Sequence, residues 1–306
     1  MPLLPLAPVA LFAYRRTSNL TQVLDRLEAC VGFSGTNVFI FSDGPKPGAE
    51  ADVMAVRRLV RDRLRPNMSL VEAPRNQGLA RAIISGVQDM CERFGRVIIL
   101  EDDLLPSPSF LAWFNRALDR YAQDERVWQV SGHQFPVPEF RDRRQGMFLN
   151  FATSWSWGTW KRAWGHFDAD ATGWEVLAEN AALRTRFDFG GAYPYAAMLE
   201  DQIAGRVDSW AIRWWWSMFR AGALGLFPPR ALVANVGDDP AATHRASRLA
   251  RLFKPAQATM QEMPALPEAV ALDIQAEQAV QRFLRAQTRR QEIARSVFGR
   301  LNQVLN

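Results

Sequence analysis

Three consecutive carboxylates, Glu101, Asp102 and Asp103, are the residues of this 306-residue chain whose types and spacing point most directly to chemistry. They follow an apolar run at residues 97–100, which predicts a strand buried on both faces. Ligands bind where such strands end in open α/β sheets. Because adjacent carboxylates repel one another, a divalent cation or another positive group is needed to offset their charge.

The triplet therefore predicts a site for Mg²⁺ or Mn²⁺, since both metals prefer oxygen ligands such as carboxylates and phosphates. A second interpretation gives the acids no chemistry: they begin a loop and cap the helix expected near residues 107–121. The segment by itself does not decide between these two interpretations.

The segments around the triplet predict the elements that must position it. Two kinds of segment alternate: apolar, strand-like runs at residues 9–13, 37–41, 70–72 and 97–100, and helical patterns at residues 20–31, 50–64, 79–94 and 110–121. Strict alternation of strand and helix is typical of βαβ units and a parallel sheet. We therefore expect residues 1–132 to form a Rossmann-like half of the fold.

The pattern changes after residue 132 to aromatic-rich, irregular segments. Strand-like pieces remain at residues 147–151, 224–227 and 231–235. We interpret residues 133–263 as the acceptor-side half of the same domain and residues 264–306 as a C-terminal helical tail. The expected fold class is thus α/β, with a mostly parallel central sheet and helices on both faces.

Polar segments follow the first three predicted strands, at the same sheet edge as the acids. They contain Arg16, Asp43 and Arg81, respectively. An Asp at this edge can accept hydrogen bonds from a base or from ribose hydroxyls, and an Arg can offset pyrophosphate charge. The chain has neither the Gly-Lys-Ser/Thr pattern of a P-loop nor the Gly-x-Gly-x-x-Gly pattern of a dinucleotide fold.

Composition limits the partners and the compartment. There are 37 basic and 32 acidic residues, a formal charge of +5, and the basic residues are nearly all arginines. Such a bias can come from genome composition, so we expect no nucleic-acid partner. Cys30 and Cys91 both fall in helix-like stretches, which is consistent with free thiols and a reducing compartment. The apolar residues 1–13 lack the form of a signal peptide, and we expect a cytoplasmic protein.

These features resemble the GT-A-fold glycosyltransferases, which use nucleotide-activated sugars. The acid triplet is similar to their Asp-x-Asp type motif, and the closer likeness is to N-acetylglucosaminyltransferase I and its relatives. The likeness covers roughly residues 9–244. It includes an Arg-containing loop, an Asp at the end of the second strand, a Pro and a Phe-rich helix after the acids, and segments at residues 130–132, 154–160, 208–210 and 237–244.

The resemblance implies a role for each donor-site residue. Arg16 and Asp43 would hold the nucleotide, with Asp43 near the uracil. Glu101 and Asp102 would contact the ribose or the donor sugar. Asp103 would ligate a Mn²⁺ ion that bridges the diphosphate and acts as a Lewis acid for the leaving group.

His244 would lie near the metal and the diphosphate, and whether it is a ligand is left open. The implied reaction is metal-dependent, inverting transfer of a sugar from a UDP-sugar to a hydroxyl of a glycan or lipid-linked acceptor. N-acetylglucosamine is the leading donor sugar by resemblance only.

The inverting mechanism needs a carboxylate that takes the proton from the acceptor hydroxyl. In the relatives this base directly precedes a Trp, but here Ser209 precedes Trp210 and Asp208 lies one residue earlier. We take Asp208 as the candidate base and Asp201 as the second choice. The alternative for Asp208 is to cap the helix expected over residues 210–219.

Two further features have competing interpretations. Trp155 and Trp157 are candidate sugar contacts, because a Trp face can stack on a sugar ring, although most tryptophans belong to a core. The Arg-rich helix expected over residues 276–305 could touch anionic lipid at the inner face of the membrane. We favour the simpler roles for it: packing on the domain or pairing with a second subunit.

Two other functions compete with glycosyl transfer. A nucleotidyltransferase that forms sugar nucleotides would need a Gly-rich loop after the first strand, and residues 14–16 contain no glycine. A non-catalytic carbohydrate-binding or nucleotide-sugar-binding protein would keep the sheet without the base, and Ser209 before Trp210 keeps this alternative open.

Overall fold

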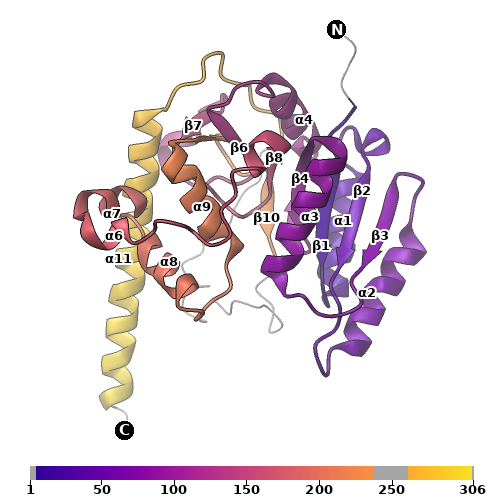
Figure 1. Ribbon diagram of the computed structural model, residues 1–306, viewed down its shortest axis with the longest axis horizontal. Helices are drawn as coiled ribbons and strands as arrows, with labels where there is room; N and C mark the ends of the chain where they lie inside the picture. The colour runs from indigo at the N-terminus through magenta and orange to yellow at the C-terminus, as the bar shows by residue number, and fades with distance from the viewer. Residues whose placement is uncertain (1–4, 237–260, 305–306) are drawn as a thin grey trace.

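One mixed sheet runs through the part of the chain that the structure describes, residues 5–236 and 261–304. The structure is a computed structural model, and its eight-stranded sheet has the order β3-β2-β1-β4-β8-β6-β9-β7 (Figure 1). The first four strands are parallel: β1 (Val9–Ala13), β2 (Val38–Ser42), β3 (Met68–Glu72) and β4 (Arg96–Glu101). The other four are β6 (Val127–Ser131), β7 (Met147–Leu149), β8 (Trp157–Trp160) and β9 (Leu224–Phe227).

Helices cover both faces of the parallel half. Its helices are α1 (Thr17–Glu28), α2 (Glu50–Arg63) and α3 (Leu79–Phe94). The chain moves outward from β1 to β3 and then returns to β4, and such crossovers are right-handed, so α3 lies on the face opposite α1 and α2. The α/β fold predicted from the sequence, with a mostly parallel sheet and helices on both faces, is confirmed.

The other described elements surround the second half of the sheet. They are β5 (Leu104–Pro106), α4 (Phe110–Arg120), α5 (Lys161–Trp164), α6 (Val176–Glu179), α7 (Ala181–Phe187), α8 (Tyr195–Ile203), α9 (Trp210–Ala221), β10 (Val233–Asn235) and α11 (Ile274–Val304), with 3-10 turns at Phe33–Gly35 and Pro138–Phe140. Strands β5 and β10 form a separate two-stranded ladder. The sequence did not predict β6, β8 or α8 as elements.

Strand β8 joins the two halves because it pairs antiparallel with both β4 and β6. Its N-terminal end therefore lies at the edge where β4 and β6 end. Successive side chains of a strand face opposite sides. Gly158 lies against Phe114 of α4, whereas Trp157 stacks on Trp210 of α9 with ring centroids 5.0 Å apart.

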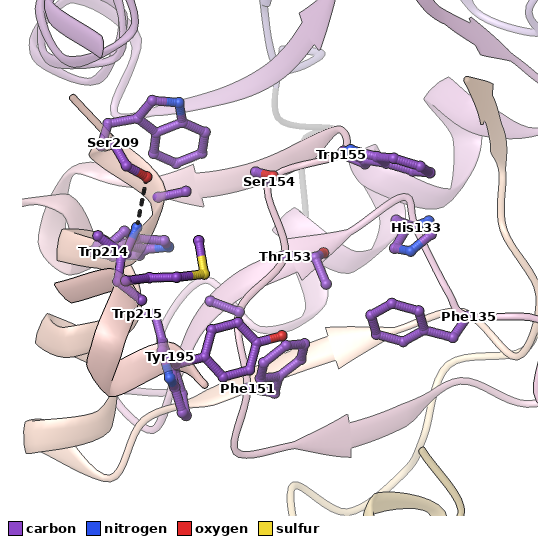
Figure 2. A pocket seen from close by; sticks show the side chains of 15 residues that line it. His133, Phe135, Phe151, Thr153, Ser154, Trp155, Tyr195, Ser209, Trp214 and Trp215 are labelled. Carbon is purple, nitrogen blue, oxygen red and sulfur yellow. Dashed lines mark hydrogen bonds between the residues drawn. The ribbon is translucent and has the colours of Figure 1, made fainter. Parts of the chain in front are cut away.

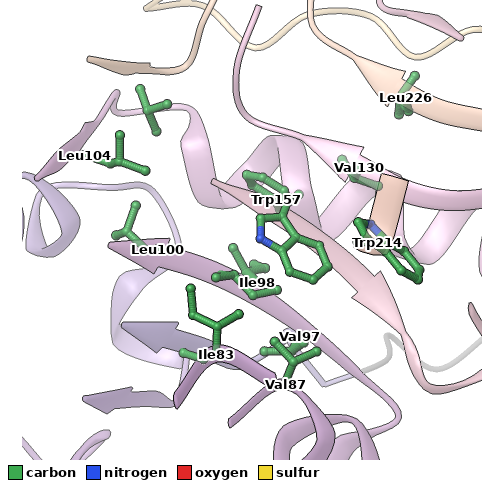
Figure 3. Packing of buried hydrophobic residues seen from close by; sticks show 14 of the residues in the cluster. Ile83, Val87, Val97, Ile98, Leu100, Leu104, Val130, Trp157, Trp214 and Leu226 are labelled. Carbon is green, nitrogen blue, oxygen red and sulfur yellow. The ribbon is translucent and has the colours of Figure 1, made fainter. Parts of the chain in front are cut away.

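The apolar core is continuous across this junction. Figure 3 shows Ile83 and Val87 of α3 beside Val97 of β4, and Trp157 of β8 beside Trp214 of α9. All five side chains are fully buried or nearly so. Core packing therefore extends without a break from the parallel half into the aromatic half.

Helix α11 packs against the aromatic half, and Figure 1 shows it running along that side of the molecule. Its buried residues Ala276, Ala279, Val280 and Leu284 recur at helical spacing. The carboxylate of Glu277 accepts a hydrogen bond from the Asn150 amide at 3.0 Å. The N-terminal part of the predicted tail is thus an integral layer of the fold.

Two expectations about the chain as a whole can be compared with the described residues. Cys30 and Cys91 are buried and free, in agreement with the prediction that they form no disulfide. Within residues 5–236 and 261–304, none of the helices has the length and apolar character required to cross a bilayer.

Candidate active site

The acid triplet lies at the carboxyl end of β4, where Arg16 reaches it from the neighbouring strand β1. The Arg16 guanidinium forms ion pairs with both Asp102 and Asp103, and Nη1 lies 3.1 Å from Asp103 Oδ2. The amide of Tyr14 also donates to Asp102 Oδ2, at 3.2 Å. Parallel pairing of β1 with β4 brings the two strand ends together, so the predicted proximity of these residues is realised.

The acids are held in a poorly solvated environment. Burial raises the pKa of Glu101 to about 8, and the charges of Asp103 and Asp102 raise it further, whereas Arg16 opposes the shift. Burial also raises the pKa of Asp102 to about 6 against the effect of Arg16. The cluster therefore resists carrying three negative charges, and Arg16 supplies the positive group that the sequence required.

The described residues do not complete a metal site. Within residues 5–236 and 261–304, no three His, Cys, Asp or Glu side chains are grouped so that they could hold a metal ion. Asp103 is the one proposed ligand in this part of the chain, and its carbonyl oxygen accepts a hydrogen bond from Val236 at 2.8 Å. His244 lies outside the described residues.

Asp43 organises two loops at the same edge. Its carboxylate accepts hydrogen bonds from the Asn76 side chain at 2.9 Å and from the amides of Gln77 and Gly78 at 2.9 and 3.0 Å. A Cβ at Gly44 would lie 2.3 Å from the Arg75 backbone, so the two loops touch where only glycine fits. In this arrangement Asp43 positions the loop after β3.

Basic side chains project around these loops. Arg75 precedes the loop that Asp43 holds, and Arg81 lies in the first turn of α3; both are exposed. Together with Arg16, they place positive charge at the edge where the parallel strands end. Phosphate groups are bound well by such arginines.

An aromatic pocket lies beside the acids. The β4–β8 ladder ends with the pair Ile99 and Trp157, so the residues that precede β8 lie at the sheet edge where β4 ends. The cavity measures about 250 Å³. Its lining comprises His133, Phe135, Phe151, Ala152, Thr153, Ser154, Trp155, Tyr195, Met198, Ser209, Trp210, Ala211, Ile212, Trp214 and Trp215 (Figure 2). The segment before β8 therefore brings Trp155 and the pocket to the same sheet edge as the acid cluster.

Trp157, the second predicted sugar contact, is a core residue instead. Its side chain is 0% exposed and packs among Trp164, Trp210 and Trp214. The alternation of β8 turns Trp157 into the layer under α9. It cannot reach a ligand without unfolding of the core, so it does not belong to the site.

The two candidate bases differ in their surroundings. Asp208 is exposed, pairs with Arg213 at 3.1 Å, and directly precedes Ser209, which lines the pocket. Ser209 itself caps α9 by accepting from the Ile212 amide at 3.4 Å, so Asp208 is not the cap. Asp201 lies in α8 and pairs with Arg206. Only Asp208 is adjacent to a pocket residue.

Sequence reasoning missed His133 and Tyr195 as pocket residues. Neither residue lies in an element that the sequence predicts. His133 follows β6 closely, so recognition of residues 127–131 as a strand would have brought it to the same edge as the acids. No comparable signal marks Tyr195, which reaches the pocket from the start of α8.

No family model and no curated protein matches this chain. Among solved structures it is similar to the mannosyltransferase PcManGT from Pyrobaculum calidifontis in complex with GDP-Man and Mn²⁺, with 16% identity over 71% of this chain and 74% of that one and a TM-score of 0.41. It is also similar to mouse xyloside xylosyltransferase 1, with 11% identity over 71% and 82% of the chains and a TM-score of 0.38. The galactosyltransferase LgtC with donor and acceptor sugar analogs gives 12% identity over 56% and 64% and a TM-score of 0.31.

Proposed function

We propose that this protein is a glycosyltransferase that takes a sugar from a nucleotide diphosphate donor and joins it to a hydroxyl of a second molecule. One observation carries this proposal: the cluster of Arg16, Asp102 and Asp103 lies at the same sheet edge as an aromatic pocket. A charged site beside a pocket rich in aromatic rings suits a donor with a diphosphate and an acceptor with a ring.

The donor is expected to bind over the carboxyl ends of β1 to β4. Arg16 would exchange part of its contact with Asp103 for a diphosphate oxygen, and Arg75 and Arg81 would add positive charge. The loops that Asp43 holds together lie where we place the nucleobase of the donor. Asp43 would therefore act by positioning these loops. Glu101 and Asp102 remain the proposed contacts to the ribose or the sugar.

Finer points of the proposal rest on the resemblance found in the sequence. These are UDP as the nucleotide, N-acetylglucosamine as the leading sugar, inversion at the anomeric carbon, and dependence on Mn²⁺ or Mg²⁺. Among the described residues, Asp103 is the carboxylate proposed to bind the metal.

The transfer step needs one proton acceptor. The acceptor hydroxyl oxygen attacks the anomeric carbon, the bond from that carbon to the diphosphate oxygen breaks, and the hydroxyl proton passes to a carboxylate. We assign this carboxylate to Asp208 because it adjoins Ser209 at the pocket. Attack from the side opposite the diphosphate inverts the anomeric configuration.

Calorimetry of UDP binding with and without Mn²⁺ tests the donor site. The wild type should bind UDP, and Asp103→Ala should lower the affinity at least tenfold when Mn²⁺ is present. Asp89→Ala is the matched control, because it removes an exposed carboxylate from the distal part of α3. Failure of the wild type to bind UDP or GDP under either condition would overturn the proposal.

Turnover separates the enzyme from a non-catalytic binding protein. UDP-sugars are incubated with a panel of glycan acceptors, products are detected by mass spectrometry, and NMR assigns the anomeric configuration. Asp208→Asn should lower kcat by about 10²- to 10⁴-fold without changing UDP affinity, as for loss of a general base. Asp201→Asn should leave kcat close to the wild-type value; the opposite pattern would move the base to Asp201.

A further inference from the structure

The walls of the aromatic pocket are ordered by hydrogen bonds within the protein. Trp214 Nε1 donates to Gln129 Oε1 at 2.8 Å. The hydroxyls of Thr153 and Ser131 lie 2.8 Å apart and form a hydrogen bond. The pocket is therefore preorganised, and these polar atoms are already used by the fold.

His133 differs from these residues. Its side chain is 4% exposed, and its Nδ1 is buried with no hydrogen-bond partner among the described residues. The ring lies edge-to-face against Phe135 and Trp155, with centroids 5.0 and 4.8 Å away (Figure 2). Its backbone amide donates to Ser131 Oγ at 3.0 Å, which fixes the main chain of the residue beside the pocket.

An unpaired buried nitrogen has a free-energy cost that a ligand would remove. Leaving a buried polar atom without a partner destabilises the fold. Burial also lowers the pKa of His133 to about 3, so the ring is neutral and Nδ1 can act as donor or acceptor according to its tautomer. A neutral hydroxyl satisfies either role.

The size and lining of the cavity narrow the ligand. At about 250 Å³ it is smaller than the roughly 300–1,000 Å³ typical of sites for drug-sized ligands, which suits a single ring. A pyranose has an apolar C–H face that can pack on aromatic rings and a rim of hydroxyls for polar atoms. A lipid chain or an aryl group would fill the aromatic part but leave His133 Nδ1 unpaired.

We propose that this pocket binds one pyranose ring of a carbohydrate acceptor, with Trp155 packed against the ring and His133 Nδ1 hydrogen-bonded to one of its hydroxyls. The inference rests on the proposed glycosyltransferase function and gives its acceptor a chemical class. His133 is a specificity-determining residue in this scheme. Because the residues before β8 lie at the sheet edge where β4 ends, we place the reacting hydroxyl of the same ring on the side that faces the donor.

Titration of tryptophan fluorescence in the full chain, with and without saturating UDP, tests this inference. The probes are the methyl glycosides of glucose, galactose, mannose and N-acetylglucosamine, with cyclohexanol as a ring that lacks the hydroxyl rim. At least one glycoside should bind with millimolar or tighter affinity, and cyclohexanol should bind at least tenfold more weakly. His133→Phe should weaken that glycoside at least tenfold, whereas His133→Asn, which keeps a polar atom near the Nδ1 position, should stay within threefold.

Two further variants control for folding and for ring chemistry. Trp155→Ala should also weaken glycoside binding, since it removes the ring proposed to pack on the sugar, and urea unfolding of the variant checks that the protein remains folded. His166→Phe should leave the affinity unchanged, because His166 stacks on Trp128 outside the pocket. The inference is overturned if no glycoside binds, or if His133→Phe binds it as tightly as the wild type.

The two proposals can fail separately. UDP binding without any glycoside binding would remove the acceptor pocket and leave the donor site in place. Glycoside binding that depends on His133 but occurs without any nucleotide binding would support the pocket and overturn the glycosyltransferase. Equal binding of cyclohexanol and the glycosides would show a pocket for an apolar group and contradict the inference.

Discussion

Arg16 offsets the negative charge of the acid triplet in the folded protein. Asp102 has a side chain that is 4% exposed, and its nearest positive partner is Arg16, which also pairs with Asp103. Breaking a buried ion pair leaves an uncompensated charge and is strongly destabilising. Asp102 can limit this cost by taking up a proton, because burial already raises its pKa to about 6.

Arg16→Gln should therefore lower the free energy of unfolding by about 3 kcal/mol at pH 8, where proton uptake by Asp102 is hardest. Adding Asp102→Asn should recover much of the loss, because the buried Asp102 charge is removed together with its partner. Urea unfolding of the single and double variants measures both effects. Arg93→Gln, which removes an exposed ion pair with Asp89, should change stability little. A double variant no more stable than Arg16→Gln would contradict this account.

His133 makes stability depend on pH with a definite sign. Its pKa in the folded protein is about 3, below the ordinary value of 6.5, because it is buried. Between these values the unfolded chain takes up a proton that the folded protein does not. Stability contributed by the neutral ring is thus present above pH 6.5 and is lost as the pH falls toward 3.

His133→Phe should flatten this part of the pH profile. At pH 5 the wild type should have lost about 2 kcal/mol relative to pH 8 through this group alone, from about 1.4 kcal/mol per pH unit below the unfolded pKa. Urea unfolding at pH 8, 6 and 5 for both proteins measures the difference. Parallel profiles for wild type and variant would assign the acid sensitivity to other groups.

At the residue scale, sequence reasoning was accurate where one strand determined the outcome. The acids were predicted at a strand end, and Arg16 and Asp43 at the same edge, because parallel strands end together. Trp157 was misassigned because the face of the sheet to which its side chain points depends on how β8 pairs with β4. The paired residues Ile99 and Trp157 are 58 positions apart in the sequence. A single sequence does not carry that register.

At the element scale, the loops after β2 and β3 behave as one unit. The Asp43 carboxylate accepts hydrogen bonds from Gly44, Asn76, Gln77 and Gly78. These contacts join a turn after one strand to the start of the next helix. One side chain, Asp43, therefore holds together the loops that are proposed to contact the nucleobase.

Asp43→Asn should loosen this unit. An amide can accept through only one of its two terminal atoms, so some donors of the loop lose their partner, at a cost of about 1–2 kcal/mol. Hydrogen exchange should show faster exchange at the amides of Gln77 and Gly78, and UDP affinity should fall. Asp52→Asn, on the exposed side of α2, is the control and should change neither quantity. Unchanged exchange at both amides would show that the loop is held by other contacts.

Most helices and strands followed from local pattern, among them α1 to α4, β1 to β4, β7, β9 and α9, whereas β5, β6, β8 and α5 to α8 did not. Helix α3 was predicted with its observed ends, and its apolar stripe is strong. Strand β8 was missed because it is only four residues long, Trp-Gly-Thr-Trp, and all four are buried, so polar and apolar residues do not alternate along it. Its stability comes from β4 and β6 on either side, which is tertiary information.

At the scale of the whole molecule, the sheet makes residues before and after 132 one folding unit. Strand β8 hydrogen-bonds to β4 on one side and to β6 on the other. The hydrophobic core is continuous across this junction. Unfolding of either half would therefore expose core residues of the other half. The halves that differ in sequence pattern are expected to unfold together.

Two intrinsic probes can test this cooperativity. Nine of the eleven tryptophans follow residue 132, while Cys30 and Cys91 are buried thiols in the first half. Urea unfolding followed by tryptophan fluorescence and by thiol reactivity should give the same midpoint. A single cooperative transition has one midpoint urea concentration, whichever probe follows it. Midpoints that differ by more than about 0.5 M would therefore indicate separately unfolding units.

The antiparallel direction of β8 also has a consequence for how the binding surfaces of this protein can evolve. Donor-side groups follow the first four strands, at residues 14–16, 43–44, 75–81 and 101–103. Pocket residues instead lie after β6, before β8, and in α8 and α9. The two sets share no segment of chain. Substitutions that reshape one recognition surface can therefore accumulate without touching the other, and the same scaffold can acquire a new acceptor while it keeps its donor.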